Sequence, residues 1–431
     1  MNDIRQLIED GKVTGLQVTV FLVCITMNML DGMDVLVIAY VAPALAADWS
    51  TSPQTLGTIF SAGMLGMTAG AMFLAPIADR IGRRKMIMIC VVVMGAGILL
   101  TAYVRTEGEL IFLRFASGLG IGAMLATAAT MAAEYSPERN RNFIVSFVLS
   151  GYPLGATLSG FAAAWIIPEY GWRAMFIAAG SVTLLTLPIV WLKLPESLDF
   201  LIKTKPPRAL EKANHILEVM GYEARSELPE VPPEAKKASV AELFKHGRQM
   251  PTVWLWTAFF TSFATLYFLT SWIPKLAEST GLSLRLAIYA GTVFNLGAYF
   301  GILSQGYLSQ TFGLRRVISF FLVGTAVLMC IFGYVSQSWL ILLLFGLIGY
   351  GVQGGFVGFY TVSARLYPTE IRNTGIGWGI GAGRIGAIVG PKLGGTLIGM
   401  GLALSTNFVI FSVPLLIAAV ATRMIKSDNV S

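Results

Sequence analysis

Two carboxylates lie in the middle of an apolar stretch, FLVCITMNMLDGMDVLVIAYVAPALAA. Asp31 and Asp34 are three residues apart, which places them on one face of a helix. Ionised carboxylates are costly in hydrocarbon, so such acids are either functional or neutralised by a partner. Because two like charges at this spacing cannot both ionise cheaply in a low dielectric, one of them can take up and release a proton. The pair therefore predicts a proton-binding site.

Two arginines also lie inside apolar runs. Arg384, in GAGRIGAIVGPKLGG, lies about ten residues into its predicted helix, and its planar guanidinium suits a carboxylate. It is predicted to bind an anionic substrate; a static pair with Asp31 or Asp34 is the alternative. Arg114, in RFASGLGIGA, lies only about 8 Å inside, where it could also snorkel to the surface. Lys392 is either a charge on the access path or a second snorkelling side chain.

Aromatic residues in the predicted spans could stack on a ring-shaped substrate. Packing, or a belt at the membrane interface, is the alternative for each of them. The candidates for substrate contact are Tyr40, Trp272, Tyr360 and Trp378.

The composition is that of a membrane protein. Of the 431 residues, 55% are hydrophobic and only 13% are charged, whereas a soluble domain carries about 25% charge. Cys24, Cys90 and Cys330 all lie in apolar runs, which argues against a disulfide framework or a metal site. Both histidines, His215 and His246, fall in one hydrophilic segment. Proton chemistry inside the membrane is therefore left to carboxylates.

Runs of about 20 apolar residues predict twelve membrane helices. They lie near residues 16–46, 54–78, 86–104, 110–133, 142–166, 172–193, 251–274, 285–308, 316–335, 338–362, 374–400 and 403–424. The hydrophilic segment between the sixth and seventh is a predicted loop with one amphipathic helix near 206–220. Lys and Arg gather on the side of the termini and of this loop, which makes that side cytoplasmic. The net charge of +7 is thus a topology signal and gives no reason to expect a nucleic-acid partner.

An internal repeat at an offset of 231 residues divides the chain. ADRIGRRK (78–85) aligns with SQTFGLRR (309–316), and Pro43 aligns with Pro274. GLGIGA and GYGVQG hold the same register. Separate landmarks in one register predict two six-helix halves in parallel orientation, with the substrate handled between them.

These landmarks predict an all-α membrane protein of twelve transmembrane helices in two pseudo-symmetric halves. The N-terminal half is expected at 1–194, the cytoplasmic linker at 195–249 and the C-terminal half at 250–431.

The string APIADRIGRRK could lock two helix ends together on the cytoplasmic side. It offers an acid beside a helix end, several cations and a glycine that permits a tight turn, although a simple positive-inside anchor is the alternative. Similar strings with interleaved acids and bases, EYSPERNR and RLYPTEIRN, are expected to form salt bridges that hold this side closed. The gating candidates are Asp79, Arg80, Gly82, Arg83, Arg84, Glu134, Arg141, Arg365 and Arg372.

The loop string and the two-half repeat resemble the major facilitator superfamily over nearly the whole chain. The Asp-Gly-x-Asp string followed by Ala-Pro, together with GRIGAIVGP, resembles the aromatic acid:proton symporter branch of that superfamily. This resemblance implies transport by alternating access and a part in proton coupling for Arg114.

The favoured prediction is a proton-coupled importer of small aromatic or related organic carboxylates in a bacterial inner membrane, with both termini cytoplasmic. LPESLDFL (194–201) also resembles sugar porters, so sugars or polyols are an alternative cargo, and a non-transporting sensor is a second alternative. The sequence has no Ser/His/Asp set, metal-ligand cluster or phosphate loop, so neither an enzyme nor a cofactor is expected. The expected partners are an organic anion, a proton and membrane lipid, and the expected state is a monomer.

Overall fold

The computed structural model describes residues 4–229 and 240–425. All regular secondary structure in these two ranges is helical. The helices before residue 194 are α1 Ile4–Asp10, α2 Gly15–Trp49, α3 Pro53–Ala69, α4 Ala78–Ile81, α5 Arg83–Thr101, α6 Glu107–Glu134, α7 Arg141–Leu149, α8 Gly151–Tyr170, α9 Trp172–Leu185 and α10 Leu187–Lys193. The later helices are α11 Leu198–Thr204, α12 Ala209–Val219, α13 Gln249–Ser279, α14 Leu284–Phe312, α15 Leu314–Ile331, α16 Ser338–Leu366, α17 Thr369–Gly399 and α18 Leu404–Met424.

Polar caps mark where the first two long helices begin. The Thr14 side chain accepts from the backbone N–H of Gln17, whose side chain accepts in return from the Thr14 backbone N–H, so α2 starts with a capping box. Ser52 accepts from the backbone N–H of Thr55, and Pro53 occupies the first turn of α3. These short loops therefore fix where each apolar run enters its helix.

Eleven helical stretches among the described residues are long and apolar enough to cross a membrane. The twelfth predicted helix, α17, is not among them, because it is rich in glycine and carries Arg372, Arg384 and Lys392. It is nevertheless 31 residues long and packs along α13 and α3, which are themselves in the group of eleven. The all-helical, twelve-span fold predicted from the sequence is confirmed, with α17 as its most polar member.

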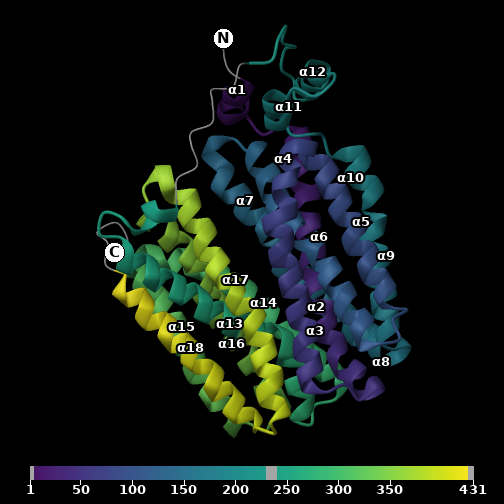
Figure 1. Ribbon diagram of the computed structural model, residues 1–431, viewed down its shortest axis with the longest axis vertical. Coiled ribbons are helices and arrows are strands. Elements are labelled where there is room, and N and C mark those ends of the chain that lie inside the picture. Colours follow the sequence, from purple (N-terminus) through teal and green to yellow (C-terminus); the bar gives the residue numbers. More distant parts are fainter. Residues whose placement is uncertain (1–3, 230–239, 426–431) are drawn as a thin grey trace.

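The same helix pairs meet before and after the linker. The α2–α8, α3–α6 and α5–α9 contacts correspond to α13–α17, α14–α16 and α15–α18. The two bundles meet through a further related pair, α3–α17 and α8–α14, with α2 against α13 between them. Figure 1 shows the two bundles side by side, the first in purple and blue and the second in green and yellow. The packing thus repeats with the chain, as the sequence offset predicts.

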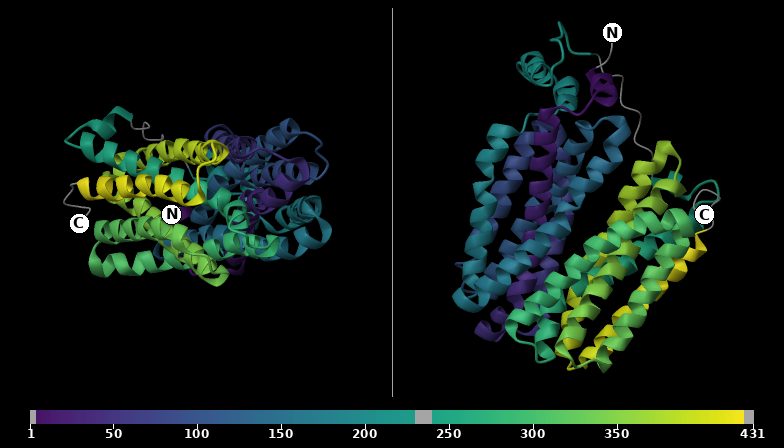
Figure 2. Two further views of the ribbon diagram at one scale, coloured as in Figure 1. Left: turned by 90° about the horizontal axis from the view of Figure 1, so that it is seen from below. Right: turned by 180° about the vertical axis from the view of Figure 1, so that it is seen from behind.

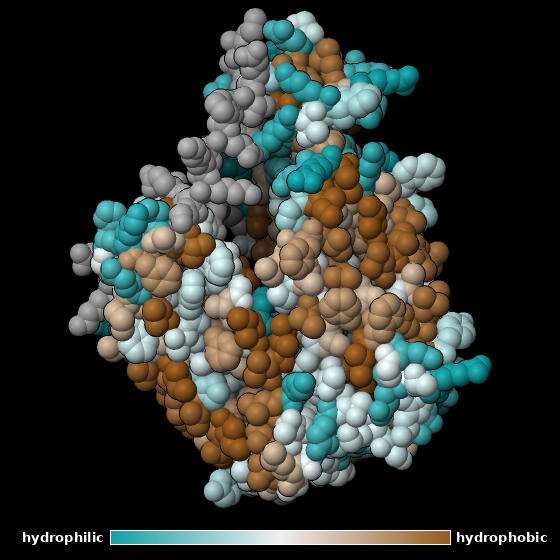
Figure 3. Space-filling model, viewed as in Figure 1, coloured by the Kyte–Doolittle hydropathy of each residue, from teal (hydrophilic) through white to brown (hydrophobic). Residues whose placement is uncertain are grey.

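The two bundles touch at one end and separate at the other (Figures 1 and 2). We call the end that carries α1, α11 and α12 the linker end, and the opposite one the far end. Toward the far end, the Ser61 hydroxyl donates to the Ile388 carbonyl at 2.7 Å, and Arg285 pairs with Glu169 at 3.1 Å. Figure 3 shows a recess between the bundles toward the linker end. The structure is therefore closed at the far end and open toward the linker end.

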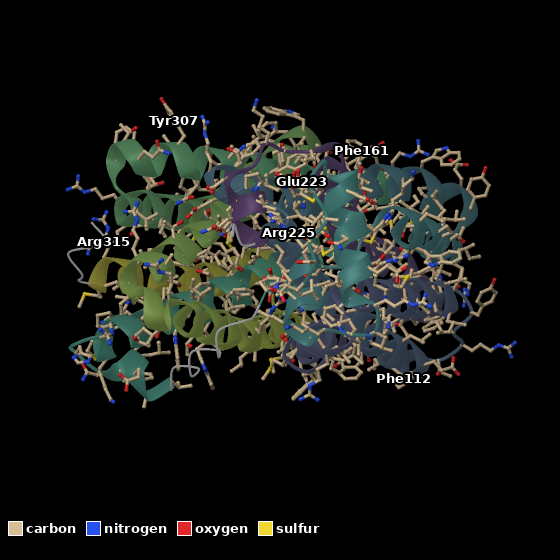
Figure 4. All side chains as sticks on the ribbon, turned by 90° about the horizontal axis from the view of Figure 1, so that it is seen from above. Phe112, Phe161, Glu223, Arg225, Tyr307 and Arg315 are labelled. Carbon is tan, nitrogen blue, oxygen red and sulfur yellow. The ribbon has the colours of Figure 1, made fainter. Side chains whose placement is uncertain are left out.

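The outer sides of both bundles are apolar. Hydrophobic residues cover these sides in Figure 3, and hydrophilic residues gather at the ends. Phe112 and Tyr307, at opposite rims in Figure 4, have exposed fractions of 67% and 74%. Large apolar side chains exposed in this way are the lipid contacts expected of membrane helices.

The linker end is organised by short helices. The predicted amphipathic helix near 206–220 is confirmed as α12, whereas α1 and α11 were not predicted, because seven residues are too few to show a helical period. The Tyr222 hydroxyl donates to the Leu7 carbonyl at 2.9 Å, and Arg141 pairs with Glu9 at 2.9 Å. These contacts hold α1 and the linker against the first bundle. Part of the predicted loop, 230–239, lies outside the described residues.

Candidate functional site

Asp31 and Asp34 are completely buried on α2. Both side chains have an exposed fraction of 0%, and none of their four carboxylate oxygens has a hydrogen-bond partner among the described residues. Gly32 lies between them, and a Cβ atom there would clash with the backbone carbonyl of Tyr152 on α8. The close approach of α2 and α8 therefore depends on this glycine. It brings Asp31 near Tyr152, with which it interacts electrostatically.

Arg114 lies beside Asp34. Its exposed fraction is 2%, and its Nη2 atom donates to the backbone carbonyl of Asp34 at 3.0 Å. The Nε and Nη1 atoms have no partner among the described residues. The guanidinium does not form an ion pair within 4.0 Å of either aspartate, although it interacts electrostatically with Asp34. Arg114 is thus buried rather than snorkelling, and its charge lies close enough to respond to the state of the Asp34 carboxylate.

Arg384 is placed by the close packing of α17 on α13. A Cβ atom at Gly386 would clash with the carbonyl of Phe260, and one at Gly390 with the carbonyl of Ala264. Two glycines four residues apart on one face therefore let the two backbones touch. Arg384 stands two residues before Gly386, on the stretch of α17 that this contact fixes.

The Arg384 guanidinium has free hydrogen-bonding capacity. The residue is half-buried, and its Nη1 atom is buried without a partner among the described residues. No ion pair joins it to Asp31 or Asp34 within this part of the chain, so the alternative of a static pair with α2 is not what the structure shows. A buried donor without a partner is costly, and a carboxylate supplied by a ligand would satisfy it.

Two tyrosines, Tyr152 and Tyr360, lie within electrostatic range of Arg384, and Tyr267 lies within range of both of them. The Tyr267 ring stacks on Phe263 at 5.6 Å, with 15° between the planes. Tyr152 belongs to α8 of the first bundle, whereas Tyr267, Tyr360 and Arg384 belong to α13, α16 and α17 of the second. Together these residues offer aromatic faces and hydroxyl groups near one cation.

The four aromatic candidates from the sequence lie in different surroundings. Tyr360 packs its ring edge-on against Phe259 and Phe356 and lies next to Arg384. Tyr40 is fully buried, and its hydroxyl donates to the Ala156 carbonyl at 2.8 Å. The structure therefore brings Tyr360 to the arginine and places Tyr40 in a packing contact.

The two tryptophans contact other residues. Trp272 is fully buried, its indole N–H donates to the Pro391 carbonyl at 3.0 Å, and its ring meets Phe60 edge-on. It belongs to the contacts that close the far end. Trp378 has an exposed fraction of 49% and stacks on Trp256 at 5.9 Å.

Sequence reasoning missed Tyr152 and Tyr267. A signal for Tyr152 was present, because the offset of 231 residues places it opposite Gly383, the neighbour of Arg384. Tyr152 therefore lies one position before Pro153, the counterpart of Arg384 on α8. For Tyr267 the sequence holds no signal that separates it from the other tyrosines of the spans.

The gating candidates at the linker end form contacts within the first bundle. Arg83 pairs with Asp79 and, at 2.9 Å, with Glu134, which also accepts from the Ser197 hydroxyl at 2.5 Å. The side chains of Arg83 and Glu134 are 12% and 11% exposed, whereas that of Asp79 is 69% exposed. Glu134 is therefore the better shielded partner, and the ion pair ties the loop after α4 to the end of α6.

Gly82 and Arg84 connect the same loop to the start of the linker. Gly82 has φ of +104°, a conformation that favours glycine, and a Cβ atom there would clash with the Glu196 carboxylate. The Glu196 Oε1 atom accepts from the backbone N–H of Arg84 at 3.1 Å. The Arg84 guanidinium donates to the Trp191 carbonyl. The turn is thus shaped to receive the linker carboxylate.

The remaining gating candidates do not cross between the bundles. Arg80 and Arg365 are exposed, Arg141 pairs with Glu9, and Arg372 donates to the Tyr367 carbonyl at 3.4 Å. Among the described residues, the ion pair Arg285–Glu169 joins the two bundles, and it lies at the far end. A salt bridge across the linker end, as expected for a closed state, stays a prediction for a conformation other than this one.

Lys392 lies at the far end of α17. Its side chain is exposed, and its Cα atom lies where a Cβ atom at Gly57 would touch it. It is therefore part of the α3–α17 contact. Within 4–229 and 240–425, no group of three or more His, Cys, Asp or Glu residues is arranged to hold a metal ion.

Comparison with known proteins gives a consistent result. Residues 24–305 and 275–429 match the model of the Major Facilitator Superfamily. A gallate transporter of Pseudomonas putida is 32% identical, with 97% of this chain and 94% of that protein covered. The 4-hydroxybenzoate transporter PcaK of Acinetobacter baylyi is 34% identical, with 97% and 93% covered. A benzoate transport protein of the same organism is 29% identical, with 98% and 92% covered.

Solved structures share the fold at lower identity. The crystal structure of a D-xylose-proton symporter superposes with a TM-score of 0.76 at 18% identity, covering 96% of this chain and 98% of that one. A bacterial homologue of the human lysosomal transporter Spinster, in an inward-facing conformation, gives 0.71 at 18% identity, with 96% of each chain covered.

Proposed function

The chain belongs to the major facilitator superfamily, whose members are membrane transporters rather than enzymes, and we propose that it imports small aromatic carboxylates together with protons. The observation that carries this proposal is Arg384, a half-buried arginine with an unpartnered donor and with Tyr152 and Tyr360 within electrostatic range. The relatives named for gallate, 4-hydroxybenzoate and benzoate transport favour an aromatic acid as cargo.

Substrate binding requires both the charge and the rings. The guanidinium of Arg384 would receive the carboxylate through charge-assisted hydrogen bonds. Tyr152, Tyr267 and Tyr360 would flank the ring, and the stacking of Tyr267 on Phe263 fixes one of these aromatic faces. The hydroxyl groups of a neutral sugar could accept from Arg384 but would bring no negative charge to pair with the guanidinium, which is why the sugar alternative is not favoured by this site.

The proton is assigned to the carboxylates of α2. Asp31 and Asp34 are buried and lack hydrogen-bond partners, so a bound proton removes a costly buried charge. Arg114 would sense the change, because its guanidinium is held on the Asp34 backbone and interacts with that carboxylate. Tyr152 lies within electrostatic range of both Asp31 and Arg384, so a change of charge at either site would be felt at this tyrosine between them.

Alternating access would move the bundles about these sites. We place the first half at 1–194, the linker at 195–249 and the second half at 250–431, with the linker end and both termini in the cytoplasm of a bacterium, and expect a monomer. The described conformation is then open to the cytoplasm. The Asp79–Arg83–Glu134 contacts lie within the first bundle and are formed while the linker end is open, so a role in the outward-open state would require further contacts from this group to the second bundle.

Uptake into proteoliposomes tests the cargo class. Labelled 4-hydroxybenzoate or benzoate should accumulate and be displaced by unlabelled aromatic acids, whereas labelled xylose should not. Benzamide, the neutral counterpart of benzoate, should compete poorly. Xylose uptake without benzoate uptake would refute the proposal.

A further inference from the structure

A basic pocket and an apolar groove meet at one residue, Trp191, on the outside of the first bundle. The pocket has a volume of about 620 Å³ and lies between α2, α10 and α12 at the linker end. The groove has a volume of about 540 Å³ and lies between α5 and α10. Trp191 lines both, and its exposed fraction is 62%. Neither cavity contains a residue of the proposed transport site on α2, α6 or α17.

The pocket carries an excess of positive charge. Arg84, Lys193 and Lys212 line it as permanent cations, with His215 beside them. Glu196 and Glu211 also line it, so the permanent cations outnumber the acids by one. Glu196 accepts backbone N–H groups from Arg84 and from Ser197, and Glu211 lies 3.9 Å from Arg208.

Arg84 lines the pocket and is held in place by the Trp191 backbone. Its Nη2 atom donates to the Trp191 carbonyl, which holds the guanidinium at the point where pocket and groove meet. Its Nε atom is buried and has no partner within the described part of the chain. The residue as a whole is half-buried and lines the pocket, so the positive charge of its guanidinium faces any anionic group bound there.

The groove is apolar throughout and leads away from the pocket along the membrane helices. Met88 and Val92 follow Arg84 at steps of one helical turn on α5, so the groove descends about 6 Å per step from the guanidinium. Leu187 and Pro188 form its other wall, where the sixth span is interrupted between α9 and α10. A linear hydrocarbon chain fits such a groove, whereas a free anion would leave it empty.

We propose that one phospholipid with a net negative headgroup binds at this place. Its phosphate lies among Arg84, Lys193 and Lys212, and one acyl chain follows the groove past Trp191. Tryptophan at this depth is typical of the membrane interface, and cations at the membrane surface attract acidic lipids. A zwitterionic lipid has no excess negative charge to match the pocket.

Native mass spectrometry of the full-length, delipidated protein tests the headgroup. Phosphatidylglycerol and phosphatidylcholine with identical acyl chains are titrated separately. We expect one phosphatidylglycerol to be retained, and retention to weaken about 30-fold in the Lys193→Gln, Lys212→Gln double variant, which removes two surface cations. Lys205→Gln is the matched control, an exposed linker lysine outside the pocket, and should bind as the wild type does.

Two further arms separate a lipid from a free phosphate and test the groove. Val92→Trp fills the groove at a position that is 43% exposed, and should weaken phosphatidylglycerol retention without lowering the melting temperature of the lipid-free protein. Inorganic phosphate at millimolar concentration should neither displace the lipid nor stabilise the protein. Equal retention of the two lipids, wild-type binding by the double variant or by Val92→Trp, or stabilisation by phosphate alone would each overturn the proposal.

Discussion

Replacing Arg384 by alanine should abolish most of the affinity for an aromatic acid. Losing one partner of a buried charge-assisted contact costs about 2–5 kcal/mol, and the half-buried position of Arg384 favours the lower end. A loss of about 2 kcal/mol corresponds to roughly 30-fold weaker binding. Arg384→Lys should recover only part of it, because an ammonium cannot reproduce the planar fork of the guanidinium.

Isothermal titration with 4-hydroxybenzoate and with its neutral amide measures this loss. The acid should bind the alanine variant at least tenfold more weakly than the wild type, while the weak binding of the amide should change little. Because no ion pair joins Arg384 to Asp31 or Asp34, the variant should also be obtained folded in normal yield. Equal binding of the acid by both proteins would refute the role of Arg384, and collapse of the folded yield would support the static-pair alternative.

Three further results are expected. Asp31→Asn and Asp34→Asn should each insert normally and bind substrate, yet fail to accumulate it under a pH gradient; accumulation by both variants would exclude the pair as the proton site. Gly32→Ala should lower the melting temperature of the purified protein, because its Cβ atom would clash with the α8 backbone, and an unchanged melting temperature would contradict that contact. Glu134→Gln should lower the melting temperature more than Asp79→Asn, because Glu134 is the more buried partner of Arg83; the reverse order would argue against the ion-pair description.

The helices and their repeat were predictable, because hydropathy and glycine spacing are local properties of the chain. The alignment of Pro43 with Pro274 placed α2 and α13 in corresponding positions, and the structure packs them against each other. The polar helix α17 was predicted as a span even though its arginine and lysine residues lower its hydropathy. The short helices α1 and α11 were not predictable, because their stability comes from contacts such as Arg141–Glu9 rather than from their own sequence.

The surroundings of the candidate residues were predictable only in part. Asp31, Asp34 and Arg384 could be recognised from the sequence because they are charged residues inside apolar runs, where charged side chains are rare. Which aromatic ring lies near Arg384 depends on the rotation of each helix and on contacts between distant segments. Tyr152 therefore escaped notice, and the contact of the candidate Trp272 with the Pro391 carbonyl was not predictable.

The partners of the loop charges were likewise set by tertiary structure. Arg83 pairs with Glu134, which is 51 residues away in the sequence, and Arg84 donates to the Trp191 carbonyl on α10. The sequence identified the charged loop but held no information on which helix ends would lie beside it in a given conformation.

The coupling of aromatic acid to proton movement is the central claim, and proteoliposomes that contain the purified protein test it most directly. An inward pH gradient, acidic outside, should drive labelled 4-hydroxybenzoate above its external concentration, and a protonophore should remove the accumulation. Addition of the acid without an imposed gradient should carry protons inward, seen as acidification of a dye trapped in the vesicles, with Asp34→Asn as the inactive control. Uptake that only equilibrates, with no dye response and no effect of the protonophore, would contradict the account.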